Sequence, residues 1–123
     1  MQTEMRFCQK NCFQWSNNII RAGICILRIF DLCYFLAGLP AEEAEDTFTK
    51  DEWLKIVKAV AAGYESISKL SAKEKSAVPC VMECIEILCA AYFISVKDTK
   101  RADDAVRVFH FIRNCESDIL SVI

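Results

Sequence analysis

The segment from Ile19 to Leu39 is almost wholly apolar, yet it contains Arg28 and Asp31. It is long enough to cross a bilayer, but charged side chains are expensive there, so the sequence favours a buried central helix over a membrane span. Three residues apart on a helix, Arg28 and Asp31 can face each other. Burying such a pair adds little stability, so we expect it to fix one arrangement or to belong to a site.

A low content of turn residues favours helices along the whole chain. Of 123 residues only three are glycine and two are proline, while 54% are hydrophobic. This length predicts one domain. We expect an N-terminal segment over residues 1–18, with a possible strand remnant between Arg6 and Trp15. An all-α, four-helix bundle-like domain is expected over residues 19–123.

Two capping boxes indicate where helices begin. Thr49 with Glu52, and Ser71 with Glu74, each place a hydroxyl three residues ahead of a glutamate, so that each side chain can bond the other's backbone N–H. Pro79 follows the second box closely, and since proline suits a first turn, the helix could instead begin near Val78.

Other boundaries follow from proline and from polar residues. The first helix is expected to stop at 38–40, because the residue before Pro40 resists helical geometry. The acidic stretch 41–46 reads as a solvated linker, and Asp98 or Thr99 is expected to cap the last helix. Helical periodicity predicts these inward positions on the later helices: Trp53, Ile56, Val57, Val60, Tyr64 and Ile67; Val78, Val81, Met82, Ile85, Leu88, Cys89, Tyr92, Phe93 and Val96; Ala102, Ala105, Val106, Phe109, Ile112 and Ile119.

The eight cysteines bear on compartment and metal binding. Several, including Cys33 and Cys84, lie in apolar helical patterns, so we expect a reducing cytoplasm in which cysteines act as small buried hydrophobes. Cys80 and Cys84 are spaced by four, as are two cysteines near the N-terminus. Without CxxC pairs and with His110 as the single histidine, we expect no metal site and no cofactor.

Charge argues against a nucleic-acid partner. The formal net charge is −2, and no basic cluster exceeds Lys100 and Arg101. There is also no glycine-rich phosphate loop and no histidine-based nucleophile system, so no catalytic residue is assigned.

An acidic pair, Glu83 and Glu86, interrupts an otherwise apolar helix, and their spacing of three places them side by side. Two interpretations stay open: a polar stripe facing water, or an acidic patch lining a groove for a cationic or hydroxyl-bearing ligand. Tyr34, Tyr64 and Tyr92 could line such a groove, although aromatic residues at helical spacing usually belong to a core.

Three features occur in a suggestive order: RIFDLCYFLAG at 28–38, an amphipathic helix that begins with Trp53 and carries Gly63–Tyr64, and LSAKE at 70–74 before an apolar helix. Over roughly residues 11–118 this order resembles the C-terminal helical part of the phosphotransferase enzyme family. That superfamily includes aminoglycoside phosphotransferases, homoserine kinases and choline kinases, and shares a protein-kinase-like fold. By this resemblance Arg28 and Asp31 match an Arg-x-x-Asp-Leu segment whose aspartate structurally supports the active-site loops.

The resemblance has clear departures. Cys12 stands where the family has its metal-binding aspartate, and the ATP-binding lobe and catalytic loop have no counterpart, so magnesium-dependent phosphoryl transfer is not expected. The resemblance implies a truncated small-molecule kinase domain, inactive alone, with a small-molecule acceptor and a missing lobe or self-association as partner. The alternative is a small cytoplasmic helical protein-interaction module; a membrane-associated helix is less favoured.

Overall fold

Five helices follow one another in the computed structural model, which describes residues 29–42 and 49–123. They are α2 (Phe30–Glu42), α3 (Lys50–Ile67), α4 (Ala72–Ser95), α5 (Thr99–Asn114) and α6 (Glu116–Val122). These described residues form no strand, which confirms the all-α prediction. The proposed N-terminal segment 1–18, with its possible strand, lies outside the described residues.

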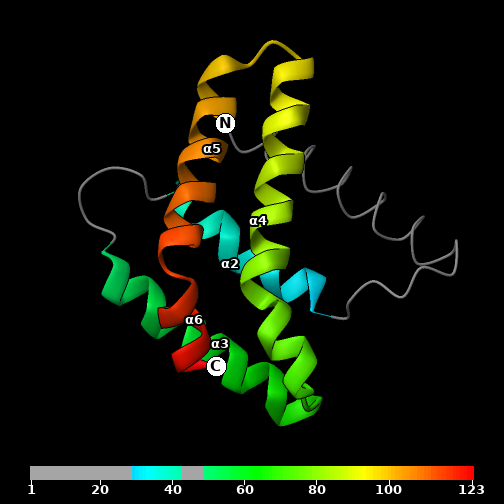
Figure 1. Ribbon diagram of the computed structural model, residues 1–123, viewed down its shortest axis with the longest axis vertical. Helices are drawn as coiled ribbons and strands as arrows, with labels where there is room; N and C mark the ends of the chain where they lie inside the picture. The colour runs from blue at the N-terminus through cyan, green and yellow to red at the C-terminus, as the bar shows by residue number, and fades with distance from the viewer. Residues whose placement is uncertain (1–28, 43–48) are drawn as a thin grey trace, which may run out of the picture.

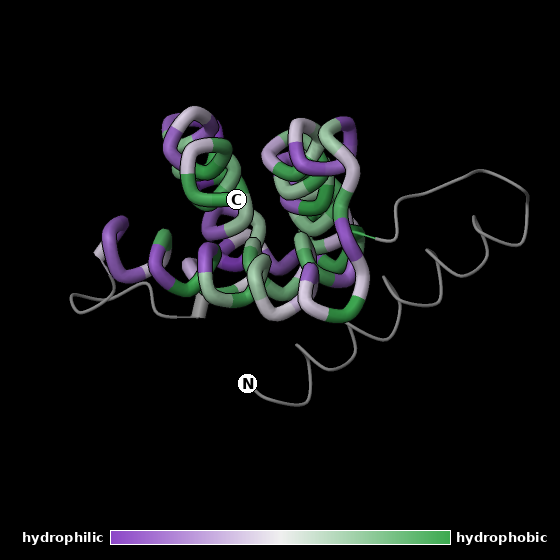
Figure 2. Tube along the Cα trace, turned by 90° about the horizontal axis from the view of Figure 1, so that it is seen from below, coloured by the Kyte–Doolittle hydropathy of each residue, from purple (hydrophilic) through white to green (hydrophobic). Residues whose placement is uncertain are grey.

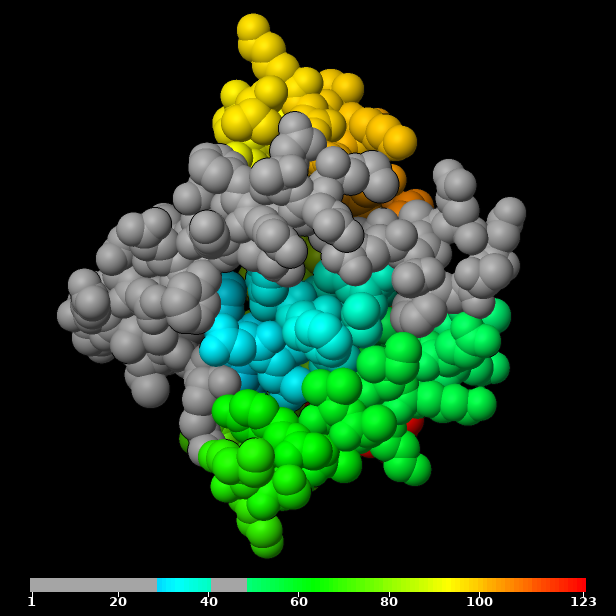
Figure 3. Space-filling model, turned by 180° about the vertical axis from the view of Figure 1, so that it is seen from behind, coloured from blue at the N-terminus to red at the C-terminus, as the bar shows by residue number. Residues whose placement is uncertain are grey.

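The helices form two layers. α4 and α5 run side by side in opposite directions, as expected for a short connection, and α2 crosses behind both of them (Figure 1). Viewed along the hairpin, α4 and α5 lie over the layer that α2 and α3 form (Figure 2). Seen from behind, α2 and α3 lie next to each other on one face (Figure 3). α6 follows α5 and contacts both α3 and α4.

Both predicted capping boxes are present. Thr49 Oγ1 accepts from the Glu52 N–H at 3.2 Å, and Glu52 Oε2 accepts from the Thr49 N–H at 3.3 Å. Ser71 and Glu74 make the same pair of bonds at 3.2 and 2.7 Å. α4 therefore begins directly after Ser71 and carries Pro79 inside it. The alternative start near Val78 is wrong, because the capping box satisfies the first turn's free N–H groups.

Of the two candidate caps for α5, Asp98 takes the position. Its Oδ1 accepts from the Arg101 N–H at 3.2 Å, and its Oδ2 accepts from the Arg101 side chain at 3.1 Å. The turn ahead of it contains Lys97 at a φ of 60°, the left-handed region. This residue lets the chain reverse between α4 and α5 within three residues.

α2 continues through Pro40, where the sequence predicted its end. Proline has no N–H, so the carbonyl of Leu36, four residues earlier, lacks its usual helical donor. The indole N–H of Trp53 on α3 donates to that carbonyl at 2.9 Å. A tertiary contact thus satisfies the group that proline would leave unpaired, and the predicted stop is wrong for this reason.

The predicted last helix is divided. Cys115 interrupts it as the C-cap of α5 and is followed by α6, so the described residues hold five helices and not the four expected. The side chain of Cys115 is buried at this break. An ion pair of 2.6 Å between Lys50 Nζ and Asp118 Oδ2 connects the start of α3 to α6.

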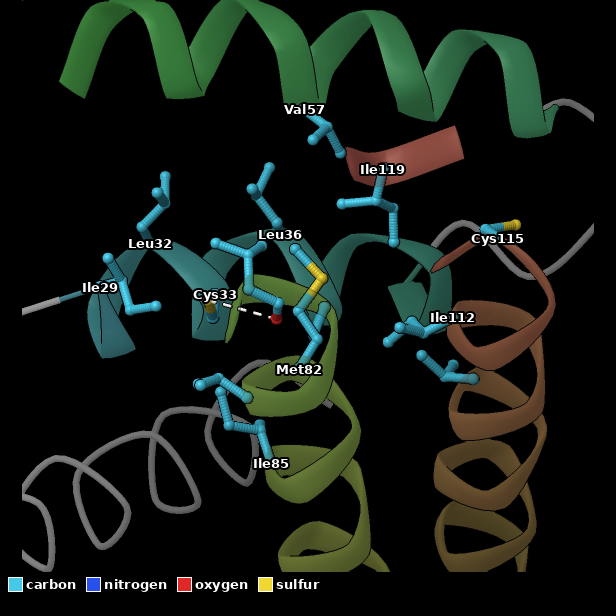
Figure 4. Close-up of a cluster of buried hydrophobic side chains, with 14 of the residues drawn as sticks. Ile29, Leu32, Cys33, Leu36, Val57, Met82, Ile85, Ile112, Cys115 and Ile119 are labelled. Atoms are coloured by element: carbon cyan, nitrogen blue, oxygen red, sulfur yellow. Dashed lines mark hydrogen bonds between the residues drawn. The ribbon is translucent and has the colours of Figure 1, made fainter. Parts of the chain in front are cut away.

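The core lies where the two layers meet. Met82 of α4 lies among side chains of α2, α5 and α6, and Val57 of α3 points toward Ile119 (Figure 4). The Cys33 thiol contacts the Val78 carbonyl of α4 at 3.8 Å, the dashed line in Figure 4. Most predicted inward positions are buried or packed against the core. Four are wrong because they are exposed: Ile67 at 92%, Leu88, Val96 and Val106.

Replacing Ser71 by alanine should lower the free energy of unfolding by about 1 kcal/mol, because it removes the acceptor that caps α4. Urea denaturation followed by circular dichroism measures this. Ser76→Ala in the same helix is the matched control, since that exposed hydroxyl only donates to the Lys73 carbonyl of its own helix. Equal losses in the two variants would show that the cap contributes nothing specific.

Candidate functional site

Asp31 lies on the first turn of α2 and is exposed. Ile29, Cys33 and Leu36 form the buried face of this segment at spacings of four and three, and Asp31 lies off that face. The expectation that Asp31 is buried within a central helix is therefore wrong. Its carboxylate stands at a helix N-terminus, where negative charge is favourable. Arg28, its proposed partner, lies outside the described residues.

Neither member of the acidic pair on α4 is fully exposed to water. Glu86 is 5% exposed, and Glu83 is half-buried. Oε1 of Glu83 is buried and has no hydrogen-bond partner. The interpretation as a solvated polar stripe is wrong for Glu86, which is buried, whereas Glu83 keeps part of its side chain in contact with water.

Glu83 instead faces Glu116 at the start of α6. Burial first, and then a hydrogen bond with Glu116 and the negative charge of Glu116, together raise the pKa of the Glu83 carboxyl to about 7, and Arg113 partly opposes them. Two neighbouring carboxylates resist simultaneous ionisation, so the pair holds one proton more readily than none. No sequence signal predicts this pair, because Glu116 reaches α4 only through the break at Cys115.

The other groove candidates lie far from one another. Tyr64 is near the end of α3, where its neighbour Glu65 forms an ion pair of 2.8 Å with Lys75 on the second turn of α4. Tyr92 lies seventeen residues beyond Lys75 on α4, about 25 Å away at 1.5 Å per residue, and contacts Phe93 edge to face. Tyr64, Tyr92 and the carboxylates therefore do not converge on one groove.

The outward side of α4 is apolar. Every exposed residue between positions 80 and 94 is apolar or a cysteine, and together we call them the α4 outer face: Cys80, Cys84, Ile87, Leu88, Ala91 and Ile94. Ile87 is 53% and Ile94 64% exposed. Of the two charged residues of this stretch, Glu86 is buried and Glu83 is half-buried. Between positions 80 and 94, α4 is therefore apolar on its exposed side as well as on its buried side, unlike the usual surface helix.

The sequence alone missed this face for a simple reason. α4 is apolar nearly all round, and periodicity cannot decide which side of such a helix is buried. Leu88 was assigned inward and is exposed. In Figure 1, α5 lies beside α4 and α2 behind it, which leaves the remaining side of α4 without a covering element among the described helices.

The described cysteines do not form a reactive or metal-binding centre. Burial raises the pKa of Cys33 to about 12 and also raises that of Cys115. Burial, and to a lesser extent the neighbouring Cys80, raise the pKa of the Cys84 thiol, so Cys84 stays protonated at neutral pH. Cys80 and Cys84 are exposed, which corrects the expectation that Cys84 is a buried hydrophobe. No metal-binding group of three or more side chains occurs among residues 29–42 and 49–123.

α4 is also long and apolar enough to cross a membrane, by length and composition only. The core helix of a soluble protein meets the same criterion, and one side of α4 is buried in the fold. Of the apolar segment from Ile19 to Leu39, the structure describes only the part from Ile29 onward. It forms the shorter apolar helix Phe30–Pro40.

Comparisons of the chain with protein-family models, with curated proteins and with solved structures found no match.

Proposed function

We propose that this chain is a small helical protein-interaction module that binds a protein partner through the α4 outer face. The observation that carries the proposal is the apolar exposed side of α4, where Ile87 and Ile94 face outward, while Glu86 is buried and Glu83 is half-buried. Exposed apolar side chains gain about 25 cal/mol per Å² when a partner removes them from water. A continuous apolar patch on a small domain is typical of an interaction site.

The dimensions of the face fit a helix of a partner. From Cys80 to Ile94 it extends about 21 Å at 1.5 Å per residue and is one helix wide. Peptide helices and neighbouring helices bind such narrow apolar stripes through residues at spacings of three and four. No contact among the described residues favours the phosphotransferase interpretation. Arg28 and Cys12, two of the residues on which that interpretation depends, lie outside the described residues.

Photo-crosslinking in cells tests this function. A benzophenone amino acid replaces Ile87 in the full chain, and the matched control places it at Lys58, an exposed residue of α3. We expect one discrete protein adduct at position 87 and none at 58. A second change, Ile94→Glu, should reduce the adduct at least tenfold, because it places a charge in the contact.

Other results of this experiment contradict the proposal. Equal adducts at positions 87 and 58 would mean that the crosslinks are nonspecific. Adducts with lipid alone at position 87 would favour membrane association. An adduct that survives Ile94→Glu would show that the α4 outer face is not the contact.

A further inference from the structure

We infer that the partner helix on the α4 outer face is α4 of a second copy of this chain, packed antiparallel across a two-fold axis. This inference rests on the proposed function, and it names the occupant of the face. Three observations lead to it: the spacing of the exposed residues, the alternation of small and large side chains, and the absence of charge.

The spacing is that of a coiled-coil seam. Cys80, Cys84, Ile87, Ala91 and Ile94 follow one another at intervals of four, three, four and three, and all are exposed. This repeat places one row of side chains along a straight seam that another helix can fill, each side chain entering a gap between four residues opposite. A helix is therefore the occupant that the face fits.

From Cys84 onward, the side chains along the seam alternate between small and large. When the two helices are antiparallel, Cys84 lies opposite Ile94 of the partner subunit, and Ile87 lies opposite Ala91 of the partner subunit. The two-fold axis repeats both pairs, so each of the four layers joins one isoleucine with one small residue. Such layers fill space evenly. A parallel pair would join isoleucine with isoleucine and small with small residues, so large and small layers would fill the seam less evenly.

Charge does not oppose this pairing. The exposed side chains between positions 80 and 94 carry no charge: Glu86 is buried, and Glu83 is half-buried and interacts with Glu116 of its own chain. The whole chain has a formal net charge of only −2. Two copies can therefore approach through this face without like-charge repulsion, and an antiparallel arrangement also aligns opposite ends of the helix dipoles.

The area sets the strength of the contact. One helix pair of this length covers less than the roughly 800 Å² per partner of a standard interface. We expect a dimer with a Kd of about 10–100 μM, in rapid exchange with monomer.

Sedimentation velocity of the full chain between low and high micromolar concentrations should show this change in mass. Leu88→Asp should weaken the dimer at least tenfold, because Leu88 borders the seam near the two-fold axis.

Disulfide crosslinking tests the orientation directly. In the full chain, Cys8, Cys12, Cys25 and Cys80 are replaced by alanine. One protein keeps Cys84; a second carries Cys84→Ala and Ile94→Cys. We expect an intermolecular disulfide when the two proteins are mixed in a thiol–disulfide buffer, and none from either alone. In the antiparallel pair, a cysteine at position 84 or 94 is offset from the same position of the other copy by ten residues along the helix, about 15 Å. A disulfide needs Cα atoms within about 7 Å, so neither protein alone can form one.

Each remaining outcome overturns the inference. Disulfides from either protein alone would indicate a parallel pair. A disulfide within one chain, formed when a cysteine is restored between residues 1 and 28, would mean that the chain's own N-terminal segment covers the face. A monomer at every concentration, without crosslinks, would exclude a second copy. In that case a protein adduct at position 87 in cells would still support the proposed function, and its absence would refute both.

Discussion

Replacing Trp53 by phenylalanine is expected to lower the free energy of unfolding by about 2–4 kcal/mol. Trp53 is 0% exposed, and its ring contacts Phe111 edge to face at 5.2 Å between centroids. The variant leaves a cavity and also removes the only donor described for the Leu36 carbonyl. That carbonyl has no helical partner because Pro40 lacks an N–H. Urea denaturation of each variant gives the free-energy difference.

A double-mutant cycle separates the hydrogen bond from the packing. Pro40→Ala restores a backbone N–H four residues after Leu36, so Trp53→Phe should cost about 1–2 kcal/mol less in that background. Val57→Ala, one turn further along α3 and equally buried, is the control and should cost the same in both backgrounds. If Trp53→Phe costs the same with and without Pro40, the indole bond does not compensate for proline.

The second large effect concerns the carboxylate pair. Glu83→Gln is expected to stabilise the protein by about 1–3 kcal/mol near pH 8 and to leave its stability nearly unchanged near pH 4. The folded pKa of Glu83 is raised from 4.5 to about 7. Between those values the folded state holds a proton that the unfolded state has lost. Wild-type stability therefore falls as pH rises through this range, and glutamine, which does not ionise, avoids the loss.

Two further variants complete this test by urea denaturation across the same pH range. Glu116→Gln should act in the same direction, because it removes the negative charge that keeps Glu83 protonated. Asp103→Asn, at an exposed position on α5 away from the pair, is the matched control for removing a carboxylate. A Glu83→Gln effect of equal size at both ends of the range would mean that the pair does not share a proton.

Local signals in the sequence predicted the helix starts well. Ser71 with Glu74 and Thr49 with Glu52 act within a single turn, so their bonds depend on no distant residue. Asp98 was one of two candidates, and it caps α5 for the same local reason. The helical class followed from the low content of glycine and proline.

Predictions that required knowledge of distant contacts were wrong at specific residues. Pro40 was assigned as a stop, but Trp53, thirteen residues later, donates to the carbonyl that proline leaves free. Asp31 was assigned to a buried helix and lies exposed beside the buried face of α2. The partner of Glu83 was missed because Glu116 lies thirty-three residues away along the chain.

The sequence by itself determined that the described part of the chain is helical, and it located the helix starts, since caps and backbone preferences act between near neighbours. Only the tertiary structure decided which side of α4 is buried, because an apolar helix offers several equivalent faces and packing against α2 and α5 selects among them. That selection buries Glu86, half-buries Glu83 and leaves Ile87 and Ile94 outside. Both the carboxylate pair and the proposed interaction surface follow from it.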